Sequence, residues 1–291
     1  MLRSLLSFAL FALAATASAA EPIDWEGVRF EKDVEYLGPD RQEKADLYLP
    51  EKLAPDQRCP AIVIIHGGGW VAGDKGAVRE QNIGTNFAHH GYIGMSINYR
   101  LATPETKEPT WPQNLHDCLT AVRWLRKNAG RLQVAPERIG VIGGSAGGHL
   151  AAMVGVTQPE DGLDPSGPYA EFSCRVQCAI DMYGPMLWFE QRDLPMFRQT
   201  RSEAPELYRA ATPMTHVNAK TPPILILQGT EDKTVPPEDS KAFDSALEKA
   251  GVEHQLVLVE GAGHSFALQP TQKDLRPLVF EFLDKHLRTQ P

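Results

Sequence analysis

The sequence contains little cysteine, with four residues of this type in a chain of 291. So few cysteines do not make a disulfide scaffold, and no CxxC motif or Cys/His cluster has the spacing of a zinc site. On one extended strand, Cys174 and Cys178 would lie about 13 Å apart, too far for a disulfide. We expect mostly buried thiols, with one long-range disulfide as the alternative. The sequence implies no metal and no organic cofactor.

Long hydrophobic runs are confined to the N-terminus. The first 20 residues, MLRSLLSFALFALAATASAA, combine a lone Arg3, an apolar run and the small residues Ala17, Ser18 and Ala19. This order is typical of a cleaved secretory signal peptide, and the apolar run from residue 5 to 15 is too short to span a membrane comfortably. We expect residues 1–20 to be removed. Residues 21–291 should then form a soluble domain that is secreted or periplasmic, without stable membrane insertion.

Basic residues are outnumbered by acidic ones. Lys and Arg number 29 against 37 Asp and Glu, which gives a formal net charge of −8 at pH 7. An acidic surface repels phosphate groups, so the composition counts against binding to nucleic acid and to anionic membranes. Internal repeats and low-complexity segments are also absent. The remaining candidates are globular proteins that bind or convert other kinds of molecule.

What the chain does contain is a regular alternation of predicted strands and helices. Residues 61–65 form an unbroken apolar run, which is typical of a strand buried on both faces. Further strands are predicted at residues 92–98, 138–142, 176–182, 223–228 and 255–259, and helices at 114–128, from 146 onward, 238–250 and 273–287, with another ending at Gly91. Residues 28–36 and 44–49 alternate loosely, as an antiparallel edge pair would. This order predicts an α/β fold: a mostly parallel sheet with helices on both faces.

Polar motifs follow four of these predicted strands. They are HGGGW at residues 66–70, GGSAGG at 143–148, GTEDKTVP at 229–236 and GAGHSF at 261–266. In mostly parallel sheets, reactive groups collect in the loops beyond the carboxyl ends of the strands. The motifs bring Ser145, Asp232 and His264 into that region, in this chain order, together with a glycine-rich loop.

These residue types can work together as a nucleophile and its base. A serine hydroxyl is a poor nucleophile at neutral pH, so Ser145 needs a base, and the imidazole of His264 can take its proton. Asp232 would hold the tautomer of His264 and stabilise the imidazolium. The backbone N–H groups of Gly68, Gly69 and Ala146 could converge on a developing oxyanion. Glycine around Ser145 would permit a tight turn between strand and helix.

With these motifs in this order, the chain resembles an α/β-hydrolase of the esterase/lipase branch, similar to hormone-sensitive-lipase-type proteins and to bacterial feruloyl and acetyl-xylan esterases. The resemblance covers essentially all of residues 21–291 and implies a catalytic domain. GGSAGGHLA with HGGGW is more similar to exported polysaccharide-associated esterases than to dedicated fat lipases. The resemblance implies a serine carboxylesterase that acts, through an acyl-enzyme, on short-acyl or aromatic-acid esters of small molecules or polysaccharides.

Several alternatives remain at this stage. Asp181, after another buried strand, is a second candidate for the acid, while His66 and His149 are expected to pack rather than to catalyse. Trp70 and Trp188 are candidate substrate contacts, although Trp70 could instead pack beneath the glycine loop.

The long segment of residues 157–221 predicts either a small cap over the site or ordinary core packing. A peptidase of the prolyl-oligopeptidase type and a non-catalytic binding module are the alternative functions.

Overall fold

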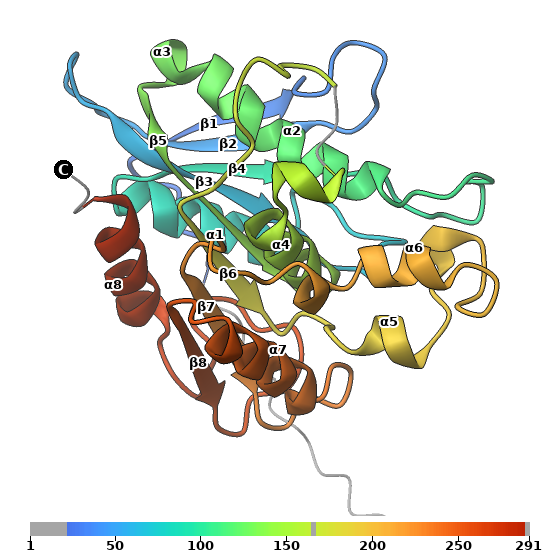
Figure 1. Cartoon of the computed structure of the whole chain (residues 1–291). Coiled ribbons are helices and arrows are strands. Elements are labelled where there is room, and N and C mark those ends of the chain that lie inside the picture. The colour runs from blue at the N-terminus through green and yellow to red at the C-terminus, as the bar shows by residue number, and fades with distance from the viewer. Residues whose placement is uncertain (1–21, 164–166, 289–291) are drawn as a thin grey trace, which may run out of the picture.

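Eight strands form one sheet across the centre of the molecule (Figure 1). The structure, a computed structural model, describes residues 22–163 and 167–288. The strands are β1 (Val28–Val34), β2 (Ala45–Pro50), β3 (Cys59–Ile65), β4 (Ile93–Ile97), β5 (Val134–Gly144), β6 (Cys178–Met182), β7 (Ile224–Gly229) and β8 (His254–Val259). The predicted signal peptide at residues 1–20 lies outside the described residues.

The strand order in the sheet is β1-β2-β4-β3-β5-β6-β7-β8. β2 pairs antiparallel with both β1 and β4, and every neighbouring pair from β4 to β8 is parallel. The mostly parallel α/β sheet and its antiparallel edge pair are therefore confirmed. Because the parallel strands share one direction, the loops that follow them meet at one edge of the sheet.

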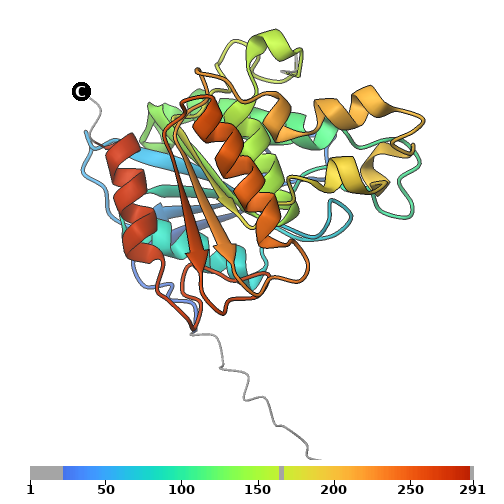
Figure 2. The same ribbon diagram turned by 60° about the horizontal axis from the view of Figure 1, so that its bottom comes forward.

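Helices cover both faces of this sheet. They are α1 (Val78–His89), α2 (Gln113–Lys127), α3 (Ala129–Leu132), α4 (Ala146–Val156), α5 (Trp188–Gln191), α6 (Pro205–Ala210), α7 (Pro237–Lys249) and α8 (Arg276–Leu287), with 3₁₀ turns at η1 (Pro159–Asp161), η2 (Pro195–Phe197) and η3 (Pro213–Thr215). Apolar side chains of α2, α4 and α7 share one hydrophobic cluster, and those of α1 and α8 share the other. Figure 2 shows α7 in orange and α8 in red, with the C-terminal strands between them.

Strand β3 shows how one short sequence contributes to both clusters. Val63 and Ile65 belong to the cluster of α2, α4 and α7, whereas Ile62 and Ile64 belong to that of α1 and α8. Successive side chains of a strand point to opposite faces, so a strand covered on both sides is apolar at most of its positions. The apolar run therefore identified a central strand.

Some predicted boundaries were wrong by a few residues. The last helix begins at Arg276 rather than at residue 273, because the Leu275 N–H donates to the Leu268 carbonyl and closes a loop before the helix. Pro277 then occupies the first turn, where a helix does not need the missing N–H.

The four cysteines are all buried free thiols, so the alternative of a long-range disulfide was wrong.

Residues 183–223 form an insertion between β6 and β7 that contains α5, α6, η2 and η3 (yellow to orange in Figure 1). Phe189, Met196, Phe197 and Tyr208 are at most 2% exposed and belong to the same hydrophobic cluster as α4. The insertion thus packs as an extension of the core, as the second of the two predicted alternatives states.

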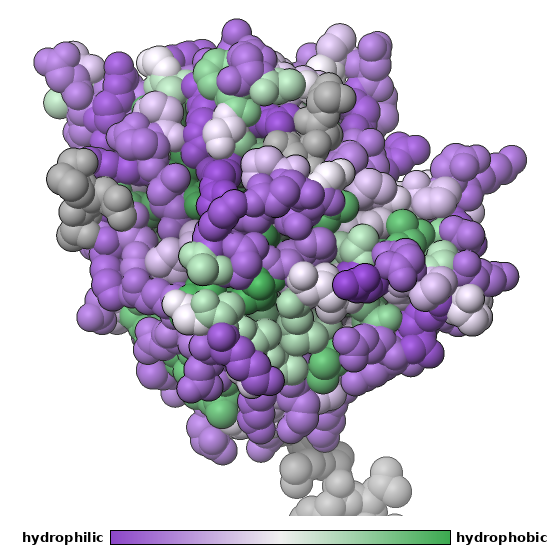
Figure 3. All heavy atoms as spheres, in the orientation of Figure 1, coloured by the Kyte–Doolittle hydropathy of each residue, from purple (hydrophilic) through white to green (hydrophobic). Residues whose placement is uncertain are grey.

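The outer surface is mostly polar on the face shown in Figure 3, where hydrophobic residues gather in a smaller area below the centre. Within residues 22–163 and 167–288, no helix combines the length and the apolar character that a bilayer crossing requires.

Candidate active site

Ser145 lies in a sharp turn between the end of β5 and the start of α4. Its backbone has φ 57° and ψ −124°, in a region that residues with a side chain rarely adopt. The glycines beside it are required by close backbone contacts. A Cβ atom on Gly143 would lie 2.1 Å from the carbonyl oxygen of Gly147, and one on Gly147 would lie 2.1 Å from that of Ile65. The turn can therefore pass close to the end of β3 only because these positions carry no side chain.

Three side chains from separate loops are connected by hydrogen bonds. The Nε2 atom of His264 lies 2.9 Å from the Oγ atom of Ser145, and the Nδ1 atom of His264 lies 2.6 Å from the Oδ2 atom of Asp232. With a proton on Nδ1 donated to the carboxylate, Nε2 can accept the proton of the serine hydroxyl. The structure thus brings together the serine, histidine and aspartate that the motifs predict.

Asp232 is held firmly in the loop after β7. Its side chain is buried, and its Oδ1 atom accepts the backbone N–H groups of Thr234 and Val235, both at 2.9 Å. A more distant amide, Gln228 Nε2, lies 3.4 Å from the Oδ2 atom. These bonds fix the direction of the carboxylate, so that Oδ2 points to His264.

Asp181, the other candidate acid, lies elsewhere. It is fully buried, its Oδ1 atom accepts the N–H of Gly184 at 2.8 Å, and its Oδ2 atom has no hydrogen-bond partner among the described residues. A Cβ atom on Gly148 would come within 2.4 Å of this carboxyl group. Burial raises the pKa of Asp181 to about 7. The histidine of the site is therefore paired with Asp232 and not with Asp181.

The glycine-rich loop after β3 runs directly beside the serine. A Cβ atom on Gly67 would be 3.2 Å from the Cβ atom of Ser145. Gly68 has φ 110° and its carbonyl accepts the N–H groups of Val71 and Ala72, which closes the loop on itself. The N–H groups of Gly68, Gly69 and Ala146 have no acceptor within the described part of the chain, so they remain available to an anion.

The motifs and their arrangement agree with comparisons to known proteins. Residues 45–247 match the model of the BD-FAE family. The chain belongs to this family. Esterase LipQ of Mycobacterium tuberculosis is 29% identical over 252 residues, which are 82% of this chain and 58% of LipQ. The chain therefore spans little more than half the length of that curated relative.

Solved structures extend the similarity to nearly the whole chain. A truncated form of a carbohydrate esterase from gut microbiota has a TM-score of 0.78 and 25% identity, covering 89% of this chain and 96% of its own. Thermogutta terrifontis esterase 2, phosphorylated by paraoxon, has a TM-score of 0.72 and 29% identity, covering 92% of this chain and 98% of its own. The α/β-hydrolase fold and the resemblance to its esterase branch are confirmed.

Two buried histidines of this BD-FAE family member have structural surroundings. His66 stacks on Tyr99 with ring centroids 4.4 Å apart, and its Nδ1 atom lies 2.7 Å from the Gly67 carbonyl oxygen. His149 stacks on Phe189 at 4.4 Å, and its Nε2 atom lies 2.8 Å from the Ala211 carbonyl oxygen. Burial lowers the pKa of each to about 4, so both are neutral at physiological pH and help to pack the loops around the site.

The two candidate substrate-contacting tryptophans differ in exposure. Trp70 is only 1% exposed and lies edge-on to His149, Trp188 and Phe189, with centroids 5.3, 6.2 and 5.8 Å away. Its indole is buried among these rings, as expected for the alternative in which Trp70 packs beneath the glycine loop. Trp188, on α5, is half-buried and carries Arg192 over its ring at 3.9 Å. Of the two indoles, only that of Trp188 reaches the surface.

A pair formed by the half-buried Arg79 and the buried Tyr183 was not predicted from the sequence. The guanidinium of Arg79 donates to the hydroxyl of Tyr183 at 3.0 Å, and this hydroxyl donates to the Phe266 carbonyl at 2.5 Å. Arg79 also lies against the serine turn, because a Cβ atom on Gly144 would be 2.3 Å from its Nη1 atom. The Tyr183 ring meets that of His264 edge-on at 4.9 Å. The pair therefore connects the serine turn to the histidine loop.

Neither residue of this pair belongs to a recognised motif. The only signal in the sequence is the position of Tyr183 directly after the predicted strand at residues 176–182.

In the part of the chain that the structure describes, no group of three or more His, Cys, Asp or Glu side chains could hold a metal ion.

The burial of Asp181 predicts a pH-dependent stability difference. In the wild type its pKa is about 7 in the folded state against an ordinary value of 3.8 for an aspartate, so the folded protein carries a buried charge above pH 7. As the pH falls from 7 to 3.8, Asp181 is protonated in the folded state and the free energy of unfolding rises. Below pH 3.8 the destabilisation by the buried charge is fully removed. Asn is neutral throughout. Asp181→Asn should therefore raise the melting temperature by several degrees at pH 8.5 and by clearly less at pH 5.

The control is Asp56→Asn at an exposed carboxylate, which should shift the melting temperature little at either pH. An advantage of Asp181→Asn that is equal at both pH values, or larger at pH 5, would contradict a raised pKa for Asp181.

The Arg79–Tyr183 pair predicts a kinetic effect. Tyr183→Phe removes the hydroxyl that connects Arg79 to the histidine loop and keeps the ring. We expect a fluorophosphonate to modify Ser145 about tenfold more slowly, the equivalent of about 1.4 kcal/mol of barrier. The matched control is Tyr208→Phe, which removes a hydroxyl bound to Leu194 and Gln199 in the insertion. Equal modification rates in the two variants would show that the pair does not position the site.

Proposed function

We propose that this protein is a secreted serine carboxylesterase that hydrolyses short-acyl or aromatic-acid esters, including esters of polysaccharides, through an acyl-enzyme. The observation that carries the proposal is the continuous hydrogen-bonded series of Ser145, His264 and Asp232, at a strained turn beside a loop with unpaired N–H groups. A serine hydrolase that forms an acyl-enzyme uses this combination of an activated hydroxyl and oxyanion donors.

The proposed reaction uses each group in turn. The Oγ atom of Ser145 attacks the ester carbonyl carbon while Nε2 of His264 takes the hydroxyl proton. The N–H groups of Gly68, Gly69 and Ala146 stabilise the resulting oxyanion. The bond to the alcohol breaks as His264 returns the proton to the departing oxygen, which leaves the acyl group on Ser145. A water molecule then loses a proton to the same nitrogen and attacks the acyl carbon. The bond between the acyl carbon and Oγ of Ser145 breaks as His264 returns the proton to Oγ, which releases the acid and restores the serine.

Asp232 acts through His264 in this scheme. It keeps the Nδ1 proton in place and stabilises the imidazolium that forms in each half-reaction. His264 must be neutral to accept the serine proton.

The ester class is supported by relatives rather than by one residue. LipQ is named an esterase, and the gut-microbiota neighbour is named a carbohydrate esterase. Export is supported by Arg3, the apolar run that follows and the small residues at 17–19. An exported esterase that is similar in structure to a carbohydrate esterase would have access to acylated polysaccharides outside the cytoplasm.

Two substitutions test the proposed roles. Ser145→Ala should lower kcat for 4-nitrophenyl acetate by at least about 10⁴-fold, and Asp232→Asn by roughly 10³- to 10⁴-fold, because the first removes the nucleophile and the second removes the partner of Nδ1. Asp181→Asn should retain most of the activity. Circular dichroism must show that all three variants fold.

The same assay separates the alternative functions. An aminoacyl anilide cleaved faster than acetyl, butyryl and feruloyl esters would favour a peptidase. Wild-type protein without activity on any of these substrates would favour a binding module. Near-wild-type activity in folded Ser145→Ala would remove Ser145 from the role of nucleophile.

A further inference from the structure

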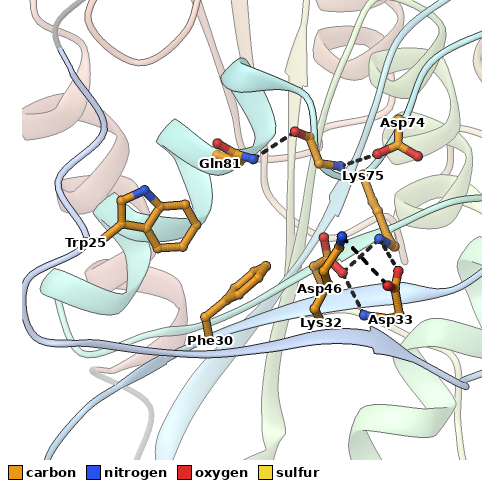
Figure 4. Close-up of a pocket in the computed structure, with 9 residues that line it drawn as sticks. Trp25, Phe30, Lys32, Asp33, Asp46, Asp74, Lys75 and Gln81 are labelled. Atoms are coloured by element: carbon orange, nitrogen blue, oxygen red, sulfur yellow. Dashed lines mark hydrogen bonds and ion pairs between the residues drawn. The ribbon is translucent and has the colours of Figure 1, made fainter.

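A cavity of about 550 Å³ opens on β1, β2 and the start of α1 (Figure 4). None of the residues that line it takes part in the proposed reaction. Two aromatic rings, Trp25 and Phe30, form one side of it. The other side is polar and includes Asp33, Asp46 and Lys75. This combination of an apolar wall and a few fixed polar groups is the usual composition of a small-molecule binding site.

The aromatic side is exposed and yet firmly supported. Trp25 is 40% exposed and Phe30 is 37% exposed. Their rings meet edge-on with centroids 5.1 Å apart, and both rest on the fully buried ring of Tyr48, at 5.9 and 5.1 Å. Rings that are fixed in this way bind a ligand without losing much conformational entropy.

The polar side is fixed by an ion cluster in which Lys75 and Asp46 are buried and Asp33 is exposed. The Nζ atom of Lys75 lies 2.8 Å from the Oδ1 atoms of both Asp33 and Asp46, and the Lys75 side chain is only 5% exposed. Asp33 has φ 56° at an irregularity in the β1–β2 pairing, so its backbone is held in the left-handed region that favours glycine. Such a conformation persists only where the surroundings determine it, and here the bond to Lys75 is part of those surroundings.

The charges decide between classes of ligand. Asp33 and Asp46 already neutralise Lys75, and Asp74 lies nearby with Lys32 as the only other cation in the lining. A phosphate or an acidic glycan would therefore find no unpaired positive cluster. A neutral sugar fits both sides, because its C–H face can pack on an aromatic ring while its hydroxyls donate to carboxylate oxygens.

The cavity lies near the same edge of the sheet as the serine. Asp46 of β2 pairs with Ser96 near the end of β4, and Ser96 pairs with Ile64 of β3. β2 and β5 are three strand spacings apart, about 14 Å. The loop after β3 joins the two places, since its first part carries Gly68 and Gly69 and its later part carries Lys75.

We propose that this cavity is a second glycan-binding site, which holds a neutral segment of the polysaccharide whose ester group is presented to Ser145. The binding of a neutral glycan stands on the cavity alone, and the link to ester cleavage rests on the proposed function. Trp25 and Phe30 provide the stacking surface, and the exposed carboxylates of Asp33 and Asp74 accept hydroxyl groups, while the buried Asp46 holds Lys75 in place.

Binding is measured separately from catalysis. In the Ser145→Ala background, affinity electrophoresis in gels that contain neutral arabinoxylan should show retardation. Trp25→Ala and Phe30→Ala should each weaken this binding about tenfold or more, whereas Trp25→Phe should retain most of it. The matched control is Leu258→Ala, which removes an equally exposed apolar side chain, 44% exposed, from β8 at the opposite end of the sheet.

Activity supplies the second readout, with Ser145 restored. Trp25→Ala should lower kcat/KM on acetylated arabinoxylan several-fold and leave kcat/KM on 4-nitrophenyl acetate unchanged. Retardation that is absent in the parent protein, or equal in Trp25→Ala and Leu258→Ala, would overturn the site. A protein that binds arabinoxylan through Trp25 but cleaves no ester would instead overturn the proposed function and leave the glycan site standing.

Discussion

The close approach of the serine turn to the end of β3 is the contact on which the rest of the site depends. The Gly147 backbone lies so near the Ile65 carbonyl that a single added methyl group could not be accommodated. This contact places the loop after β3 beside Ser145, whose backbone is strained and whose Oγ atom lies 2.9 Å from the Nε2 atom of His264. The serine, the histidine loop and the free N–H groups of the glycine loop meet because two parallel strands end side by side.

Two kinds of support keep this arrangement rigid. Behind the serine, Arg79 and Tyr183 connect the turn to the histidine loop through buried hydrogen bonds. On the other side, Trp70 and His149 pack with the insertion, so the glycine loop rests on aromatic side chains. An active site that stabilises charge needs such preorganisation, because groups that had to move during the reaction would lose much of their effect.

The sequence predicted the fold and the three linked side chains because each has a strong local signal. Apolar runs identify buried strands, and the polar motifs follow those strands. The choice between Asp232 and Asp181 could not be made in this way, since one follows a buried strand and the other lies near the end of one, and only the contact with His264 separates them. The burial of Trp70 was equally undetermined, because it depends on the distant residues Trp188 and Phe189. Arg79 and the aromatic cavity at Trp25 depend on contacts between segments far apart in the chain.

In the proposed reaction, Ser145 forms a covalent acyl intermediate with the help of His264. Trapping that intermediate is the most direct experiment on the role of Ser145. Wild-type protein is mixed with excess 4-nitrophenyl acetate, quenched in acid within milliseconds to seconds, digested, and analysed by mass spectrometry. We expect a peptide containing Ser145 that is heavier by one acetyl group, and the absence of this peptide in His264→Ala. Turnover with the acetyl group on a different residue, or with no acetylated peptide at any quench time, would contradict the proposed reaction.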